Sequence, residues 1–159
     1  MKTINNTFLF QEAVSVLKSG KNVKIRLVGQ SMFPFLHPET DILTIAPKCF
    51  NGLRVGDVVL AYYHGDYILH RIISIQKNGT YLLQGDAILK RCEWVDYRNV
   101  VGVLNSIERD NSTIICCMNC RWRVKGLLWV KMRFIRKPLL KIIGITKKCA
   151  VSNKRLDKE

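Results

Sequence analysis

The chain has 159 residues, of which 48% are hydrophobic and 24% are charged. This composition excludes an intrinsically disordered chain, and the length suffices for one domain with a hydrophobic core. No apolar run approaches the roughly 18 residues that cross a bilayer, and the first 17 residues do not resemble a secretory signal, so we expect neither a spanning helix nor export.

The excess positive charge lies near the C-terminus. The formal net charge is +14, and residues 121–159 carry 13 basic and 2 acidic residues, whereas residues 1–120 carry 13 and 10. We therefore predict a near-neutral globular domain over residues 1–120 and a basic tail over residues 121–159. A basic tail favours an anionic partner, which can be lipid, nucleic acid or an acidic protein.

Residues 1–120 are predicted to be mainly β. A first helix, ending near Gly20, is indicated by four apolar residues at helical spacing: Phe10, Ala13, Val14 and Leu17. Strand patterns separated by turn residues then occur in seven stretches: Val23–Leu27, Ile42–Ala46, Val58–Tyr63, Tyr67–Ile75, Thr80–Gln84, Val100–Ile107 and Thr113–Met118. We expect a folded or barrel-like antiparallel sheet of about seven strands, followed by C-terminal basic amphipathic helices.

The tail has the pattern of an amphipathic helix. From Trp122 to Ile145, aliphatic residues interleave with Lys and Arg, and Pro138 breaks or kinks the segment. An apolar face, a basic face, and Trp122 and Trp129 at the boundary are typical of a helix at an anionic membrane surface. A helix packed on the sheet with a solvated basic face fits equally well. Nucleic acid is the weaker partner, because the aromatic residues form no exposed stacking platform.

The six cysteines are expected to be reduced thiols, since the chain shows no export signal. Cys117 and Cys120 form a C-x-x-C, but no second pair or histidine cluster completes a set of zinc ligands. The sequence therefore predicts neither a metal nor a cofactor.

Ser31 and His70 are the residues best placed for nucleophilic catalysis. Ser31 lies in a turn after the first strand, where its hydroxyl can be presented freely, but it needs a base to accept its proton. Of the three histidines, His37 and His64 fall in predicted loops, whereas His70 falls inside an apolar strand. Because a histidine in a strand is more often structural, spacing alone does not decide between the two roles.

Five short motifs occur in one order: Gly29-x-Ser31-Met32-x-Pro34, Gly56-Asp57-Val58-Val59, His70-Arg71-Ile72, Gly85-Asp86 and Val100-Val101-Gly102. Over residues 23–104, about half of the chain, this order resembles the signal peptidase I and SOS-repressor superfamily of serine endopeptidases. The resemblance implies a β-rich fold in which a Ser is activated by a Lys or, in the branch that resembles the endoplasmic-reticulum enzyme, by a His.

Carried over by position, the resemblance implies that Ser31 is the nucleophile and His70 the general base. Asp86 would orient or electrostatically support the imidazole, and the Ser31 backbone N–H would be one oxyanion donor. The His branch usually has a further Asp where this chain has Cys92, so Glu93 and Asp96 stay open as alternatives.

Two further departures concern the oxyanion hole and the anchor. Gly29 occupies the position of a Ser that assists the oxyanion hole in many signal peptidases, and no transmembrane anchor precedes Ser31. We therefore expect a cytoplasmic serine endopeptidase that cleaves a leader or precursor peptide with small residues on the acyl side. Peripheral contact of residues 122–145 with the inner membrane face is one option. The alternative is a catalytically inactive member that binds an anionic surface through its tail. A self-cleaving DNA-linked regulator is disfavoured, because the roughly 20 residues before the sheet leave no room for a helix-turn-helix.

Overall fold

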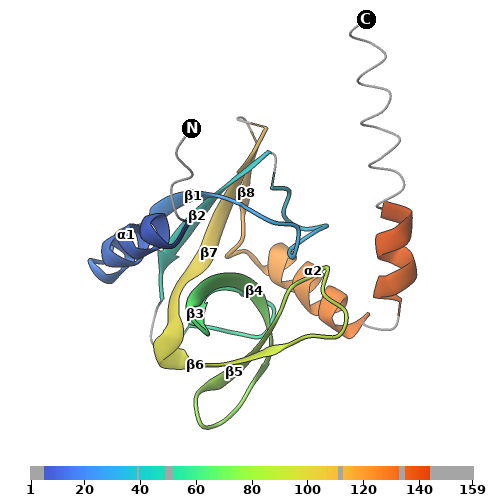
Figure 1. The fold of residues 1–159 in the computed structure, drawn as a ribbon. Coiled ribbons are helices and arrows are strands. Elements are labelled where there is room, and N and C mark those ends of the chain that lie inside the picture. Colours follow the sequence, from blue (N-terminus) through green and yellow to red (C-terminus); the bar gives the residue numbers. More distant parts are fainter. Residues whose placement is uncertain (1–5, 39, 49–51, 111–112, 133–134, 144–159) are drawn as a thin grey trace, which may run out of the picture.

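The computed structural model describes residues 6–143, except residues 39, 49–51, 111–112 and 133–134 (Figure 1). Its elements are, in chain order, α1 (Asn6–Lys18), β1 (Val23–Arg26), β2 (Asp41–Pro47), β3 (Val58–Tyr63), β4 (Asp66–Ile75), β5 (Thr80–Gln84), β6 (Glu93–Asp96), the short 3-10 helix η1 (Tyr97–Asn99), β7 (Val100–Arg109), β8 (Thr113–Cys116) and α2 (Cys120–Lys131). Residues 136–143 are also helical. Within the described ranges, every helix is too short or too polar to span a membrane.

The prediction of a mainly β fold with an N-terminal helix is confirmed. All eight strands pair antiparallel in one sheet, in the order β1-β2-β7-β3-β4-β5-β6, with β8 on β7. The sheet does not close into a barrel, because β1 and β6 each pair with one strand in the described part of the chain. The long β7 pairs with β3 near its start and with β2 and β8 further along, which lets the sheet fold over.

Strand β6 was not predicted. Its sequence is Glu-Trp-Val-Asp, in which Glu93 and Val95 are buried whereas Trp94 and Asp96 are exposed. This pattern places a carboxylate inside and an indole outside, the reverse of the usual preference of these side chains. A buried carboxylate needs a polar partner, and the partner of Glu93 is described below.

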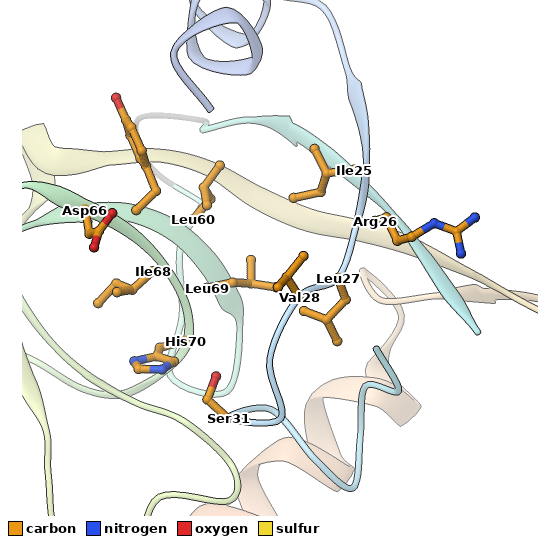
Figure 2. Close-up of a pocket in the computed structure, with 11 residues that line it drawn as sticks. Ile25, Arg26, Leu27, Val28, Ser31, Leu60, Asp66, Ile68, Leu69 and His70 are labelled. Carbon is orange, nitrogen blue, oxygen red and sulfur yellow. The ribbon is translucent and has the colours of Figure 1, made fainter. Parts of the chain in front are cut away.

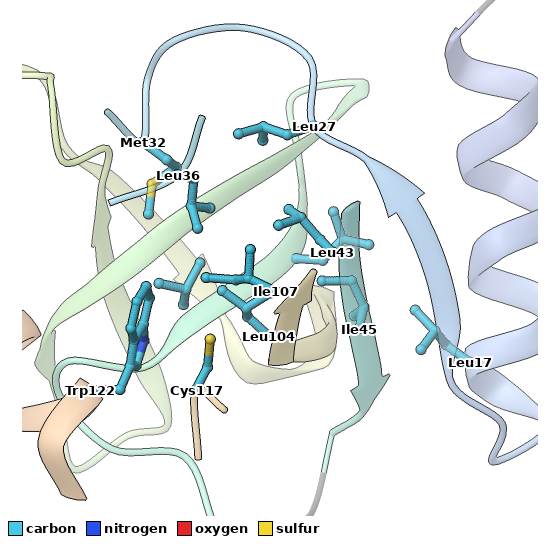
Figure 3. Close-up of a cluster of buried hydrophobic side chains, with 12 residues drawn as sticks. Leu17, Leu27, Met32, Leu36, Leu43, Ile45, Leu104, Ile107, Cys117 and Trp122 are labelled. Atoms are coloured by element: carbon cyan, nitrogen blue, oxygen red, sulfur yellow. The ribbon is translucent and has the colours of Figure 1, made fainter. Parts of the chain in front are cut away.

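Both faces of the sheet carry a core. One cluster, shown in Figure 3, is formed by Leu17, Leu27, Met32, Leu36, Leu43, Ile45, Val58, Leu60, Leu104, Ile107, Cys117 and Trp122. The other is formed by Val59, Ala61, Ile72, Tyr81, Leu83, Val95, Val100 and Val103. Alternate residues of β3 enter the two clusters, so this central strand is buried on both faces.

Helix α2 packs on the sheet through its tryptophans. Trp122 and Trp129 are 8% and 4% exposed, and Phe35 meets both rings edge-on at centroid distances of 5.7 and 5.6 Å. Of the two orientations that the sequence left open, α2 therefore takes the one in which both tryptophans lie against the protein. Helix α2 begins at Cys120, at the end of the predicted domain, and its Trp122 belongs to the core cluster of the sheet.

The helical prediction for the tail agrees in part with the structure. Helix α2 ends at Lys131, and Pro138 lies in the first turn of the helical segment 136–143, where its missing N–H costs little. Residues 144 and 145 of the predicted helix lie outside the described residues, as do Cys49 and Cys149.

Candidate functional site

Ser31 and His70 line one pocket, with a cavity volume of about 310 Å³. Ser31 lies in the loop that follows β1, and His70 lies on β4. Figure 2 shows both side chains at the same end of the pocket. The other lining side chains are mainly aliphatic: Ile25, Leu27, Val28, Leu60, Ile68 and Leu69. The fold therefore places a candidate nucleophile and a candidate base together at one end of a mainly apolar groove.

The pocket lies between two strand edges without a partner strand in the described part of the chain. Strand β1 is the end strand of the sheet and pairs with β2 alone. Residues 66–70 of β4 pair with β3 on one side, whereas β5 pairs with β4 only from Arg71 onward. Unpaired edges offer backbone N–H and C=O groups to an extended chain. The groove can therefore bind a peptide as an added strand.

The loop that carries Ser31 is anchored by burial on one side of the serine and by a turn on the other. Met32 is 1% exposed and belongs to the core, which fixes the residue after the serine. Gly29 has a φ of +85°, a left-handed conformation that favours glycine. A serine at this position would therefore be strained.

A second loop holds the Ser31 backbone from the other side. The Ala87 N–H donates a hydrogen bond to the Ser31 carbonyl oxygen at 2.8 Å. Gly85 approaches the same oxygen so closely that a Cβ at this position would lie 2.7 Å from it. The Gly-Asp motif therefore positions the candidate nucleophile through its backbone.

His70 is bound by Glu93, which lies on β6. The Nδ1 atom of His70 is 3.0 Å from Oε2 of Glu93, and the two residues are 4% and 3% exposed. A carboxylate only accepts hydrogen bonds, so Nδ1–H donates and Nε2 keeps its lone pair. The other oxygen of Glu93 accepts a hydrogen bond from Nε of Arg91 at 3.3 Å. This arrangement fixes both the orientation and the tautomer of the imidazole.

Burial lowers the pKa of His70 below its usual value of 6.5, because desolvation disfavours the charged ring. The charge and hydrogen bond of Glu93 and the charge of Asp86 oppose this effect, whereas Arg91 adds to it. His70 is therefore neutral at pH 7, the state in which it can accept a proton.

Asp86 pairs with Arg71 instead of with His70. Arg71 donates from Nε and Nη2 to the two carboxylate oxygens at 2.8 and 2.7 Å, and from Nη1 to the Gly56 carbonyl at 2.7 Å. Both side chains of the ion pair are at most 1% exposed. The expectation that Asp86 orients the imidazole is corrected: Glu93 does so, and Asp86 acts on His70 only through its charge.

The remaining candidates make other contacts or are exposed. Asp96 caps η1 by accepting a hydrogen bond from the Arg98 N–H at 2.8 Å. His37 is 3.1 Å from the Pro34 carbonyl through its Nε2, and His64 is exposed in the β3–β4 turn, as predicted. Of the three carboxylates that the sequence left open, Glu93 alone is hydrogen-bonded to His70 within the described residues.

Among the described residues, four cysteines are not joined in disulfides: Cys92, Cys116, Cys117 and Cys120. Burial raises the pKa of Cys117 to about 12, so this thiol stays protonated in the core. In the part of the chain that the structure covers, no cluster of three potential metal ligands is found.

Comparison with known proteins gives no relative. No protein-family model, no curated protein and no solved structure matches this chain.

Proposed function

We propose that the protein is a serine endopeptidase with the triad Ser31, His70 and Glu93. The observation that carries this proposal is the buried pair of His70 and Glu93, joined at 3.0 Å beside a serine in an open groove. Burying a carboxylate against an imidazole is costly for a fold, whereas it suits a base that must accept a proton at neutral pH. The resemblance of residues 23–104 to the signal peptidase I superfamily supports the same roles for Ser31 and His70.

In this mechanism, Nε2 of His70 accepts the Ser31 hydroxyl proton while Oγ attacks the scissile carbonyl carbon. The imidazolium then gives that proton to the leaving amine as the C–N bond breaks, which leaves an acyl ester on Ser31. A water molecule, deprotonated by His70, attacks the ester and releases the acid, and the proton returns to Ser31. Glu93 stabilises the imidazolium in both halves of the reaction.

The oxyanion of each tetrahedral intermediate needs a hydrogen-bond donor. Within the described residues, the Ser31 N–H donates to no protein acceptor, so it is available for this role. Gly29 adds no side-chain donor, and the backbone therefore supplies the oxyanion contact of this proposal.

The groove supports an extended peptide as substrate. The outer edge of β1 and the edge of β4 that precedes its pairing with β5 would pair with the peptide backbone, and the aliphatic lining would accommodate small or apolar side chains. We keep a leader or precursor peptide with small residues on the acyl side as the expected substrate class.

The direct test compares the wild type, Ser31→Ala and His70→Ala on a peptide library with small residues at varied positions. Mass spectrometry would read the cleavage sites, with the Lys77→Glu variant of the β4–β5 turn as an active control. We expect cleavage by the wild type and the control alone. Full activity of Ser31→Ala would contradict the mechanism, and a wild type that cleaves nothing while binding an anionic surface would favour the inactive binding protein.

The pH dependence of cleavage follows from the lowered pKa of His70. Because the base must be neutral, kcat/KM should rise with pH through a midpoint below 6.5 and then stay constant up to about pH 8. Initial rates at low substrate concentration, measured from pH 4.5 to 8.5, would check this. A midpoint above 7 would be inconsistent with the observed burial of His70.

A further inference from the structure

Helix α2 has a second face that the core does not use. Its inner face is formed by Trp122, Gly126 and Trp129, which are all buried at spacings of four and three residues. The opposite face also follows helical spacing and is exposed throughout: Arg121, Val124, Lys125, Leu128 and Lys131. Val124 and Leu128 are 46% and 54% exposed, so packing on the sheet does not explain them.

Exposed apolar side chains concentrate in this part of the molecule. Twelve large hydrophobic residues are exposed in the described part of the chain, and five of them lie between residues 124 and 142: Val124, Leu127, Leu128, Ile135 and Ile142. Exposed lysines accompany them on the segment 136–143, namely Lys137 and Lys141. The sequence contains no acidic residue between Asp110 and Asp157. The surface is therefore apolar and cationic, with no carboxylate of its own segment to neutralise it.

We propose that this outer face docks on an anionic lipid bilayer. The outer face consists of Arg121, Val124, Lys125, Leu128 and Lys131, and the exposed residues Ile135, Lys137, Lys141 and Ile142 follow it in the chain. Its aliphatic side chains would enter the headgroup region while the Lys and Arg heads lie against lipid phosphates and carboxylates. The tryptophans have no part in this contact, because they are buried on the inner face.

Two other occupants fit the surface less well. A second copy of the chain in a two-fold dimer would bring two faces of the same positive charge together, which is unfavourable. Single-stranded nucleic acid gains much of its affinity from stacking on exposed aromatic rings, and Trp122 and Trp129 are buried.

Docking would hold the candidate site close to the membrane. The inner face of α2 reaches the site directly, since Nε1 of Trp129 donates a hydrogen bond to the Asp86 carbonyl at 3.1 Å. A bilayer on the outer face would thus lie about one helix diameter, roughly 10–12 Å, from Asp86. This placement favours substrates that are themselves at the membrane surface. The docking proposal does not depend on the peptidase proposal, because it uses none of the triad residues.

The test uses the full chain as Ser31→Ala and sedimentation with vesicles, so that proteolysis plays no part. Vesicles of phosphatidylcholine alone would be compared with vesicles in which about one lipid in three is phosphatidylserine. We expect binding to the anionic vesicles only, and its loss in high salt. Absence of binding to anionic vesicles at low salt would overturn the proposal.

Two double variants locate the contact. Lys125→Glu with Lys131→Glu should weaken binding by more than about tenfold, since each basic residue near an anionic surface contributes severalfold. Val124→Ser with Leu128→Ser should also weaken it, and this loss should persist at high charge density in the vesicles. The matched control, Lys21→Glu with Lys77→Glu, makes the same charge change at exposed positions outside the outer face.

Three results would overturn the assignment. The first is an equal loss of vesicle binding in the control and in Lys125→Glu with Lys131→Glu, which would indicate that binding responds to net charge alone. The second is tighter binding of an RNA oligonucleotide than of the vesicles, in competition. The third is full binding by both double variants, with circular dichroism showing that each variant is folded.

Discussion

Replacing Glu93 by glutamine is expected to lower kcat/KM for peptide cleavage by about 10⁴-fold, the size of effect that follows replacement of the carboxylate by an amide in a Ser-His-Asp triad. Nε of Arg91 donates a hydrogen bond to one oxygen of this carboxylate, so the glutamine amide oxygen would face Arg91. Its NH₂ group would then face Nδ1 of His70, which would place the imidazole proton on Nε2. The ring would no longer accept the Ser31 proton.

The matched control is Asp96→Asn, the other carboxylate of β6, which caps η1 and does not contact His70. This variant should keep most of the activity. Glu93→Gln should also move the midpoint of the acidic limb of the pH profile to lower pH, because the charge of Glu93 raises the pKa of His70. If the kcat/KM of Glu93→Gln lay within about threefold of the wild-type value, Glu93 would have no role in the mechanism.

Replacing Asp86 by asparagine is expected to lower the free energy of unfolding by about 3–5 kcal/mol, the cost of leaving a buried charge without its partner. The Arg71 guanidinium is fully buried, and in this variant it loses the negative charge and one of its two short hydrogen bonds, because an amide has a single acceptor oxygen. It is also enclosed by Phe35, whose ring centroid lies 4.7 Å from the guanidinium carbon, so water cannot readily replace Asp86. Urea unfolding followed by tryptophan fluorescence would measure the change.

An exposed carboxylate provides the comparison. Asp66→Asn, at the start of β4, should change the free energy of unfolding by less than about 0.5 kcal/mol. If Asp86→Asn had the free energy of unfolding of the wild type but no peptidase activity, Asp86 would belong to the catalytic machinery. The structural role described above would then be wrong.

The sequence predicts most of the sheet because its strands bury alternate residues. β2 is an example: Leu43 and Ile45 are buried and Thr44 is half-buried, which is the pattern that alternation detects. Alternation does not detect β6, because this strand is four residues long and buries Glu93 while it exposes Trp94. This strand with an inverted pattern supplies the carboxylate of the candidate site.

The order of the motifs along the chain does not show which carboxylate contacts His70 and which contacts Arg71. His70 and Arg71 are neighbours on β4, so their side chains point to opposite faces of the sheet. Asp86 meets Arg71 on one face, and Glu93 meets His70 on the other. The sequence correctly placed Asp86 near this pair of residues and could not determine the face.

The tail illustrates a similar limit. Its periodicity correctly predicts a helix with two different faces, and α2 has them. Periodicity cannot tell which face meets the protein, because tryptophan suits a core and a headgroup region equally. The edge-on contacts of Phe35 with both tryptophans favour the core.

The contact of Trp129 with the Asp86 carbonyl has a consequence for the order of events during synthesis of the chain. The loop of Gly85 and Ala87 that supports Ser31 is itself held by a residue near the end of α2. A growing chain that has left the ribosome only as far as β8 already contains Ser31, His70 and Glu93, but it lacks this support. Under the proposed mechanism, the support of Ser31 should therefore be complete only after residue 129 has emerged and packed against this loop.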